Sequence, residues 1–489
     1  MQERTDNMAG SDNQKSCTKV RETPVEPIEE FHTDVNRKKL TLKIDFHIIP
    51  LLLLTYVLQF MDKLAVSNAS VFGLQEDNHL KKNEYSWVSS IFYFGYLAGQ
   101  FPTSRLVQVI PVGKFVGVTV LLWGVVLAST ASCNSYAGLL IARFFLGLLE
   151  SCVSPIFVLI TSMWYTPLQQ PLRTGIWFSG NDLGGIIGGF ISYGIGHIEG
   201  SLAPWQYIFI IYGCITILWG GCLLLLLPDS PQNAWFLTRD EKYFLSQTIQ
   251  RLSLKSPWKW YQFRECLLDL KTWILAAICV LNILPNGGIV SYGLIIIKGF
   301  GFTSVETTLL NVPAYAITMA TIIITGYIAS RFRNFRAWMI IFSVIPPIAG
   351  GSMLYKLNTL REGLRLFAYY LLNVQPSTFP HVLALISSNF QGSTKISTMS
   401  TLIFVVYCAA NIGAPQLFKS NESPKYQTAY RSWILSFCLT VFLAMTLRYF
   451  LVWENKRKDK ENKENKKEQK ASEENDITDK EDLGLKYVY

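Results

Sequence analysis

Long apolar segments recur along the whole chain, and they are the feature that most restricts its fold. Each is long enough for an α-helix to cross the hydrocarbon core of a bilayer, which takes about 20 residues. The candidate spans lie at about 46–67, 86–107, 113–133, 137–163, 174–197 and 205–227, and then at about 272–297, 305–329, 337–355, 364–388, 396–418 and 431–453. The sequence therefore predicts an all-α integral membrane protein with about twelve transmembrane helices in two six-helix bundles.

The composition supports this class and excludes others. Of the 489 residues, 50% are hydrophobic and only 16% are charged, which is too apolar for an ordinary soluble protein. The formal net charge of +9 does not indicate a nucleic-acid partner, because the basic residues flank the predicted spans. The nine cysteines are scattered and show no C-x-x-C spacing. We therefore expect no metal site and no cofactor.

Charged residues are concentrated at the two ends and in one central segment, which divides the chain. We expect a disordered N-terminus at 1–45, bundles at 46–227 and 272–453, a linker at 228–271 and a charged tail at 454–489. Lysine and arginine precede the first span and are frequent in the linker, so the positive-inside rule places both termini and the linker in the cytosol. The run of Lys, Glu and Asn in the tail predicts a solvated segment.

Arg143 and Glu150 lie within the fourth predicted span. They are two helical turns apart and therefore project from nearly the same face. A charge at this depth is costly unless it faces a partner or a watery cavity. Two interpretations remain open, namely a structural ion pair that locks helices together and a pathway for a solute and protons.

Asp62 and Lys63 place a carboxylate beside an amine in the first span. Adjacent residues point about 100° apart on a helix, so only one of them can aim straight at a central cavity. We expect Asp62 to face the cavity near the Arg143/Glu150 helix, with Lys63 pointing outward or pairing with Glu150. The alternative is that both side chains lie in the headgroup region.

The fifth span places Asn181 and Asp182 near mid-membrane, ahead of a run of glycines. An amide and a carboxylate at this depth are candidates for solute and proton binding. The glycines recur at four-residue spacing, which is typical of a helix-packing surface. They are Gly184, Gly185, Gly188 and Gly189.

Polar residues also interrupt the apolar spans of the second half. Asn282 and Asn286 flank Pro285 in the seventh span, and the proline with the two following glycines predicts either a helix break at a binding site or a packing kink. Gln375 and His381 lie in the tenth span and Asn411 in the eleventh. Histidine changes charge near neutral pH, so His381 is a candidate for proton coupling, although a helix–helix hydrogen bond is the alternative.

Several motifs resemble one known family. The chain resembles the anion:cation symporter branch of the major facilitator superfamily, and within it the fungal allantoate permease group. The shared motifs are Phe60-Met-Asp-Lys63, Tyr85-Ser-Trp-Val, Phe92-Tyr-Phe-Gly-Tyr-Leu97, Arg143 through Glu150, Pro228-Asp-Ser-Pro231, Pro285-Asn-Gly-Gly-Ile289, Ala409 through Phe418, Pro424-Lys-Tyr426, Asp476-Ile-Thr-Asp479 and Tyr487. The loop at 105–114 departs from the pattern, because it lacks the acidic residue of the superfamily's gating motif.

The resemblance implies a monomeric carrier of the cell membrane that imports a small anionic nitrogen compound or a vitamin together with protons. Such substrates include allantoate, ureidosuccinate, nicotinate, pantothenate, thiamine and short peptides. We expect substrate binding by Arg143, Asn181, Asn282, Asn286, Gln375 and Asn411, and proton coupling by Glu150, Asp62, Asp182 and His381.

Two other classes of protein are alternatives to a carrier. An enzyme needs a nucleophile with its base, a metal set or a phosphate-binding loop, and the sequence contains no H-E-x-x-H, G-x-S-x-G or Gly/Lys loop motif. A nutrient-sensing receptor built on a carrier fold remains open. Uptake of a labelled substrate distinguishes the two, because a pure sensor binds its ligand without accumulating it.

Overall fold

The protein is described here by a computed structural model, which covers residues 36–81, 83–166, 169–250, 258–332, 334–356, 361–464, 476–482 and 484–489. Each predicted span corresponds to one long helix or to two shorter helices in succession. Within the described ranges, nine segments are long and apolar enough to cross a membrane on length and composition alone. The prediction of an all-helical membrane protein is confirmed.

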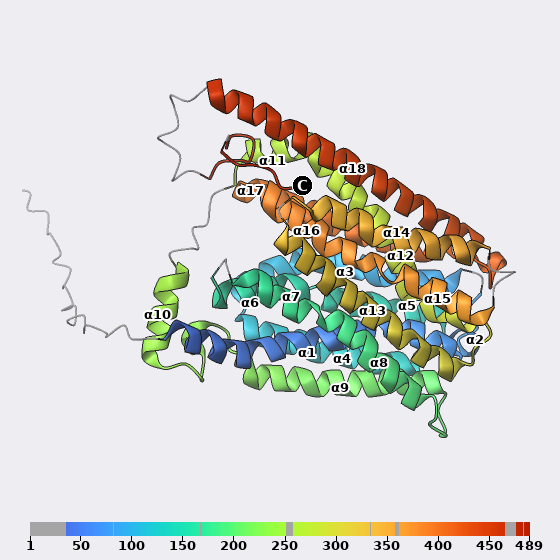
Figure 1. The fold of residues 1–489 in the computed structure, drawn as a ribbon. Coiled ribbons are helices and arrows are strands. Elements are labelled where there is room, and N and C mark those ends of the chain that lie inside the picture. The colour runs from blue at the N-terminus through green and yellow to red at the C-terminus, as the bar shows by residue number, and fades with distance from the viewer. Residues whose placement is uncertain are drawn as a thin grey trace, which may run out of the picture.

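The N-terminal bundle is built from helical spans that alternate in direction across the molecule (Figure 1). They are α1 (Arg37–Val71), α3 (Glu84–Val109), α4 (Val112–Ser129), α5 (Tyr136–Glu150), α6 (Val153–Trp164), α7 (Gln170–Phe178), α8 (Gly180–Ile195) and α9 (Pro204–Leu226), with a short α2 (Leu74–Asp77) between the first two. The fourth predicted span is divided into α5 and α6, and the fifth into α7 and α8.

The C-terminal bundle repeats this plan after two shorter helices, α10 (Arg239–Gln250) and α11 (Trp260–Leu268). Its helices are α12 (Leu270–Lys298), α13 (Ser304–Arg331), α14 (Arg336–Tyr355), α15 (Glu362–Leu372), α16 (Thr378–Asn389), α17 (Ser393–Gly413) and α18 (Gln427–Glu464). The two bundles meet along three helix pairs, α1 with α12, α3 with α17 and α8 with α13.

The two ends of the molecule carry different elements. One end holds the start of α1, the helices α10 and α11, and the last residues of the chain, and we call it the linker end (Figure 1). The opposite end holds α2 and the start of α15, and we call it the far end. Because α1 begins at the linker end, it reaches the far end at Val71.

Three expectations for the fold need correction. The disordered N-terminus at 1–45 is wrong for 37–45, which form the first turns of α1 with Asn36 as the N-cap; residues 1–35 lie outside the described ranges. Of the two alternatives for Asn282–Gly288, a helix break and a packing kink, the break is wrong, because α12 is continuous. A Cβ on Gly287 would come within 2.6 Å of Asn411 Oδ1, so this glycine serves close packing of α12 against α17.

The third correction concerns the tail, which was expected to be solvated. Glu454 and Lys458 are buried on the extended α18, and Thr478 and Asp479 are fully buried. These residues pack against the linker end of the C-terminal bundle (Figure 1). Residues 465–475 lie outside the described part of the chain.

Candidate substrate site between the bundles

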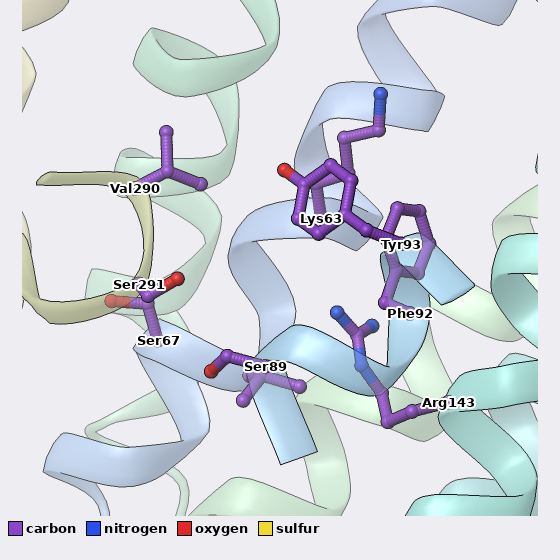
Figure 2. A pocket seen from close by; sticks show the side chains of 9 residues that line it. Lys63, Ser67, Ser89, Phe92, Tyr93, Arg143, Val290 and Ser291 are labelled. Carbon is purple, nitrogen blue, oxygen red and sulfur yellow. The ribbon is translucent and has the colours of Figure 1, made fainter. Parts of the chain in front are cut away.

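A pocket lies between the two bundles and is lined by side chains from four helices (Figure 2). Its lining residues are Lys63, Val66 and Ser67 of α1, Ser89, Phe92 and Tyr93 of α3, Arg143 of α5, and Val290 and Ser291 of α12. Sites between the halves of a membrane carrier are where substrates bind. Two of the nine lining residues are cationic and none is acidic.

Arg143 enters this pocket because α3 and α5 are in backbone contact. A Cβ on Gly147 would lie 1.9 Å from Phe92 O, and one on Gly95 would lie 2.0 Å from Phe144 O. Only glycine permits such an approach. It places the Arg143 guanidinium 4.8 Å from the centre of the Phe92 ring, a cation–π contact.

The guanidinium of Arg143 is buried but incompletely paired. The residue is 4% exposed, and its Nε and Nη1 have no hydrogen-bond partner. Figure 2 shows it pointing into the space beside Ser89 and Phe92. A buried donor without a partner is destabilising, so these nitrogens are available to an oxygen-rich ligand.

Glu150 lies on the same buried face of α5 as Arg143, as the spacing predicts. It is fully buried, and neither of its carboxylate oxygens has a hydrogen-bond partner. The neighbouring Gln59 donates a hydrogen bond to the backbone carbonyl of Glu150 at 3.3 Å. Within the described residues no ion pair of 4.0 Å or less joins Glu150 to Arg143 or Lys63, so a locked structural pair is not what the geometry shows.

The expectation that Asp62 faces the cavity is wrong, whereas Lys63 interacts electrostatically with Glu150, one of its two expected arrangements. Lys63 lines the pocket, whereas Asp62 is fully buried and accepts a hydrogen bond from Thr216 Oγ1 of α9 at 3.4 Å. The two side chains diverge as their helical positions require. Lys63 contributes to the pocket lining, but its ammonium points away from Arg143 (Figure 2) and lies 5.5 Å from the centre of the Tyr96 ring. Both still interact electrostatically with Glu150 and Arg143. The four charges therefore form one cluster of balanced sign.

Other residues of the predicted site lie elsewhere. Asp182 is buried on α8 and interacts with Tyr315 of α13, while its neighbour Asn181 is half-buried. Asn282 donates to Thr440 Oγ1 at 3.3 Å, and Gln375 Nε2 donates to the Asn282 carbonyl at 2.8 Å. These contacts form a separate polar cluster inside the C-terminal bundle.

The remaining predicted residues do not line the pocket either. Asn411 donates to Tyr407 O at 2.9 Å within α17, and Asn286 is half-buried on α12. His381 is buried on α16 with an unpartnered Nε2, and Arg336 is the charged group that acts on it. The structure thus joins Arg143, Glu150 and Asp62 and leaves the other predicted residues outside their cluster.

Sequence reasoning missed several lining residues. Lys63 was recognised as a charge but not as part of the substrate site. Ser67, Ser89 and Ser291 carry no signal, since a serine in a membrane helix most often bonds to its own backbone. Tyr93 lies in a motif that was noted for resemblance alone, although aromatic residues are typical of ligand pockets.

Hydrogen bonds between the bundles lie toward the far end. Tyr85 Oη donates to Ser291 O at 2.7 Å, and Lys298 Nζ donates to Val71 O at 2.9 Å. Gln416 Nε2 donates to Ser90 Oγ at 3.1 Å. Within the described ranges no hydrogen bond joins the bundles at the linker end. The far end is therefore the closed end of the pocket in this state.

Comparison with known proteins gives relatives along nearly the whole chain. An uncharacterized transporter of Schizosaccharomyces pombe is 33% identical over 93% of this chain and 88% of its own length. The allantoate permease of Saccharomyces cerevisiae is 33% identical over 97% and 89%, respectively. The thiamine pathway transporter THI73 of the same yeast is 33% identical over 92% and 86%.

Solved structures show the same fold. The inward-open xylose transporter XylE of E. coli aligns with a TM-score of 0.64 at 13% identity, over 83% of this chain and 95% of its own. A bacterial homologue of the human lysosomal transporter Spinster aligns with a TM-score of 0.62 at 14% identity, over 85% and 97%. The model of the Major Facilitator Superfamily matches residues 52–415. The chain belongs to this superfamily and is a multi-pass secondary transporter, not an enzyme.

Proposed function

We propose that this transporter imports a small organic anion of the allantoate or ureidosuccinate type together with protons. The observation that carries the proposal is the buried guanidinium of Arg143, which faces the pocket with two unpartnered nitrogens. A guanidinium offers paired donors whose geometry matches the two oxygens of a carboxylate. The unfilled donors of Arg143 therefore favour a carboxylate as the substrate group.

The charge of the residues that line the pocket distinguishes between the candidate substrates. Lys63 and Arg143 both line it, and no carboxylate does among the residues that the structure describes. Thiamine is a cation, and it would lie against the unpartnered guanidinium of Arg143, while Glu150 and Asp62 do not line the pocket. Allantoate and ureidosuccinate are anions with hydrogen-bonding ureido groups, which suit the serine hydroxyls of the lining. We therefore favour the anionic candidates over the thiamine class.

The transport of an anion into a cell needs a source of energy. Moving one charge against the membrane potential costs about 2.3 kcal/mol per 100 mV, so a monoanion must enter with more than one proton to be driven by voltage. Glu150 is the group that we propose to carry a proton, because its two carboxylate oxygens are buried without partners and it interacts with Lys63 and Arg143. Asp62 is the second candidate because it belongs to the same cluster.

We infer that both termini and the linker face the cytosol and that the transporter resides in the plasma membrane. The basic residues before α1 and in the linker support this orientation. Epitope tags at residue 1, at about residue 250 and at residue 489 are expected to resist labelling in intact cells. A tag that reacts from outside at any of these positions would contradict the orientation.

The direct test of the substrate class is uptake into cells that lack their own carriers for these compounds. Labelled allantoate, ureidosuccinate and thiamine are supplied separately at pH 5 and pH 7.5, with and without an uncoupler. We expect accumulation of an anion that is faster at pH 5 and abolished by the uncoupler. Accumulation of thiamine alone would overturn the substrate class, and binding without accumulation would favour the sensor.

A further inference from the structure

The last described residues of the chain, 476–482 and 484–489, cross the linker end of the C-terminal bundle, and we call them the C-terminal strap. They lie beside α11 and the linker ends of α16, α17 and α18 (Figure 1). The strap contributes Tyr487 to the apolar core of this bundle. The strap is therefore packed into the bundle through a buried side chain.

Asp479 is the centre of the attachment. Its side chain is fully buried and forms ion pairs with Lys271 of α12 and with Lys395 of α17, the latter at 2.8 Å. Its backbone carbonyl accepts a hydrogen bond from Lys458 of α18. One residue of the strap thus joins lysines from three helices.

Lys271 and Lys395 have two buried carboxylates beside them only when the strap is docked. Asp269 is the other carboxylate buried beside the lysines, and it lies 3.2 Å from both Lys271 and Lys395. Glu265 also contacts Lys395, at 2.7 Å, but is partly exposed. Without Asp479, the buried ammonium groups would outnumber the fully buried carboxylates, and an uncompensated buried charge is strongly destabilising.

Asp476 holds the beginning of the strap at the N-terminus of α17. Its carboxylate accepts hydrogen bonds from the backbone N–H of Ser393 at 2.7 Å and from the Ser393 hydroxyl at 2.8 Å. Lys259 forms an ion pair with the same carboxylate at 3.3 Å. A carboxylate at this position also interacts favourably with the helix dipole.

Two asparagines recognise the end of the strap through its backbone. Asn455 accepts from the N–H of Tyr487 at 2.8 Å and donates to its carbonyl at 2.9 Å. Asn389 makes the same pair of bonds with Val488, both at 2.7 Å. The Tyr487 hydroxyl donates to Asp479 Oδ2 at 2.8 Å. Paired backbone bonds and buried side-chain anchors are how proteins bind extended peptides.

We propose that the linker end of the C-terminal bundle is a peptide-binding site whose occupant is the C-terminal strap, and that its docking ties the linker ends of α12, α17 and α18 into one unit. The recognised chemistry is an acidic segment with aspartates three positions apart and a tyrosine eight positions after the second. Release of the strap would loosen these helix ends without touching the substrate pocket.

The first experiment uses the full-length protein in detergent and measures hydrogen exchange. Asp479→Asn is compared with Asp482→Asn, a matched change in the strap, where the side chain caps the nearby N–H groups of 484 and 485 and acts on Lys458 through its charge without forming an ion pair. We expect Asp479→Asn to raise exchange in the strap and at the linker ends of α12 and α17 by about 30-fold or more, while Asp482→Asn leaves it within twofold. Equal protection in both variants would overturn the proposal.

The second experiment asks whether the site binds the segment as a separate peptide. A chain ending at residue 475 is purified and titrated with a fluorescein-labelled peptide of residues 476–489. We expect saturable binding that is weakened about 30-fold or more in the Asp479→Asn peptide and is kept in the Asp482→Asn peptide. A monodisperse truncated protein that does not bind the native peptide would overturn the proposal. If the truncated chain does not fold, the exchange comparison in the full-length protein decides.

Discussion

Two groups of buried charges in this protein differ in how completely they are paired. At the linker end of the C-terminal bundle, Lys395 has carboxylate oxygens of Asp269 and Asp479 within 3.2 Å. In the central pocket, Arg143 and Glu150 are equally buried, but two guanidinium nitrogens and both carboxylate oxygens have no partner. The charged groups at the linker end form ion pairs with one another, whereas those in the pocket retain atoms without a hydrogen-bond partner.

The difference separates a structural role from a functional one. A buried polar group without a partner costs stability, so a protein retains one mainly where a ligand or a proton completes it. A fully paired buried cluster has nothing left to offer a ligand, but removing one member leaves an uncompensated charge. The strap cluster should therefore govern stability, and the pocket cluster should govern transport.

The largest effect is expected from Glu150→Gln, which mimics the protonated carboxyl and keeps its shape. We predict complete loss of concentrative, pH-dependent uptake, because the variant cannot release a proton, while exchange between preloaded vesicles and medium persists. Glu199→Gln, at an exposed position, is the matched control. Concentrative uptake with an unchanged acid optimum would move the proton site to Asp62 or Asp182.

Asp479→Asn is expected to lower the stability of the fold strongly and to change the substrate pocket little. The change leaves Lys271 and Lys395 with one fully buried carboxylate, so we predict a loss of about 3–5 kcal/mol in the free energy of unfolding. Denaturant or thermal unfolding of the purified protein measures it, with Asp482→Asn as control. Unfolding at the wild-type midpoint would show that the cluster does not stabilise the fold.

The smallest effect is the pH response of the strap. Burial alone would raise the pKa of Asp479, but the ammonium groups of Lys271 and Lys395 outweigh it and lower this pKa to about 2. A lowered carboxyl pKa gives stability that is present above the unfolded value of about 3.9 and is lost as pH falls toward 2. The stability difference between wild type and Asp479→Asn should therefore be constant from pH 5 to pH 8. A difference that shrinks within this range would mean that another group holds the strap.

The fold was predictable from the sequence because the apolar spans repeat at membrane length, and each predicted span has its helix. Helix continuity was not predictable. Pro285 with two glycines predicts either a break or a packing kink in α12. The structure shows a continuous helix in which the absence of a side chain at Gly287 allows Asn411 to pack closely. The docking of the strap was also not predictable, because Lys271 and Lys395, which form ion pairs with Asp479, lie more than 80 residues before it in the chain.

The candidate site was predictable in part. The spacing of Arg143 and Glu150 placed both on one buried face, since helical periodicity fixes the direction of side chains. Periodicity could not decide between Asp62 and Lys63, because the rotation of α1 about its axis depends on its contacts, such as Thr216 with Asp62. The separation of Asn282 and Gln375 from the pocket likewise depends on packing between helices that no local pattern specifies.

The measurement that tests the central claim most directly is the uptake of labelled allantoate by Arg143→Lys. A lysine keeps the charge but cannot present paired donors to a carboxylate. We predict that uptake is abolished or that its apparent KM rises at least about tenfold, at unchanged surface expression, whereas Arg264→Lys on the exposed face of α11 transports normally. Wild-type uptake by Arg143→Lys would contradict the claim that the unpartnered guanidinium binds the substrate.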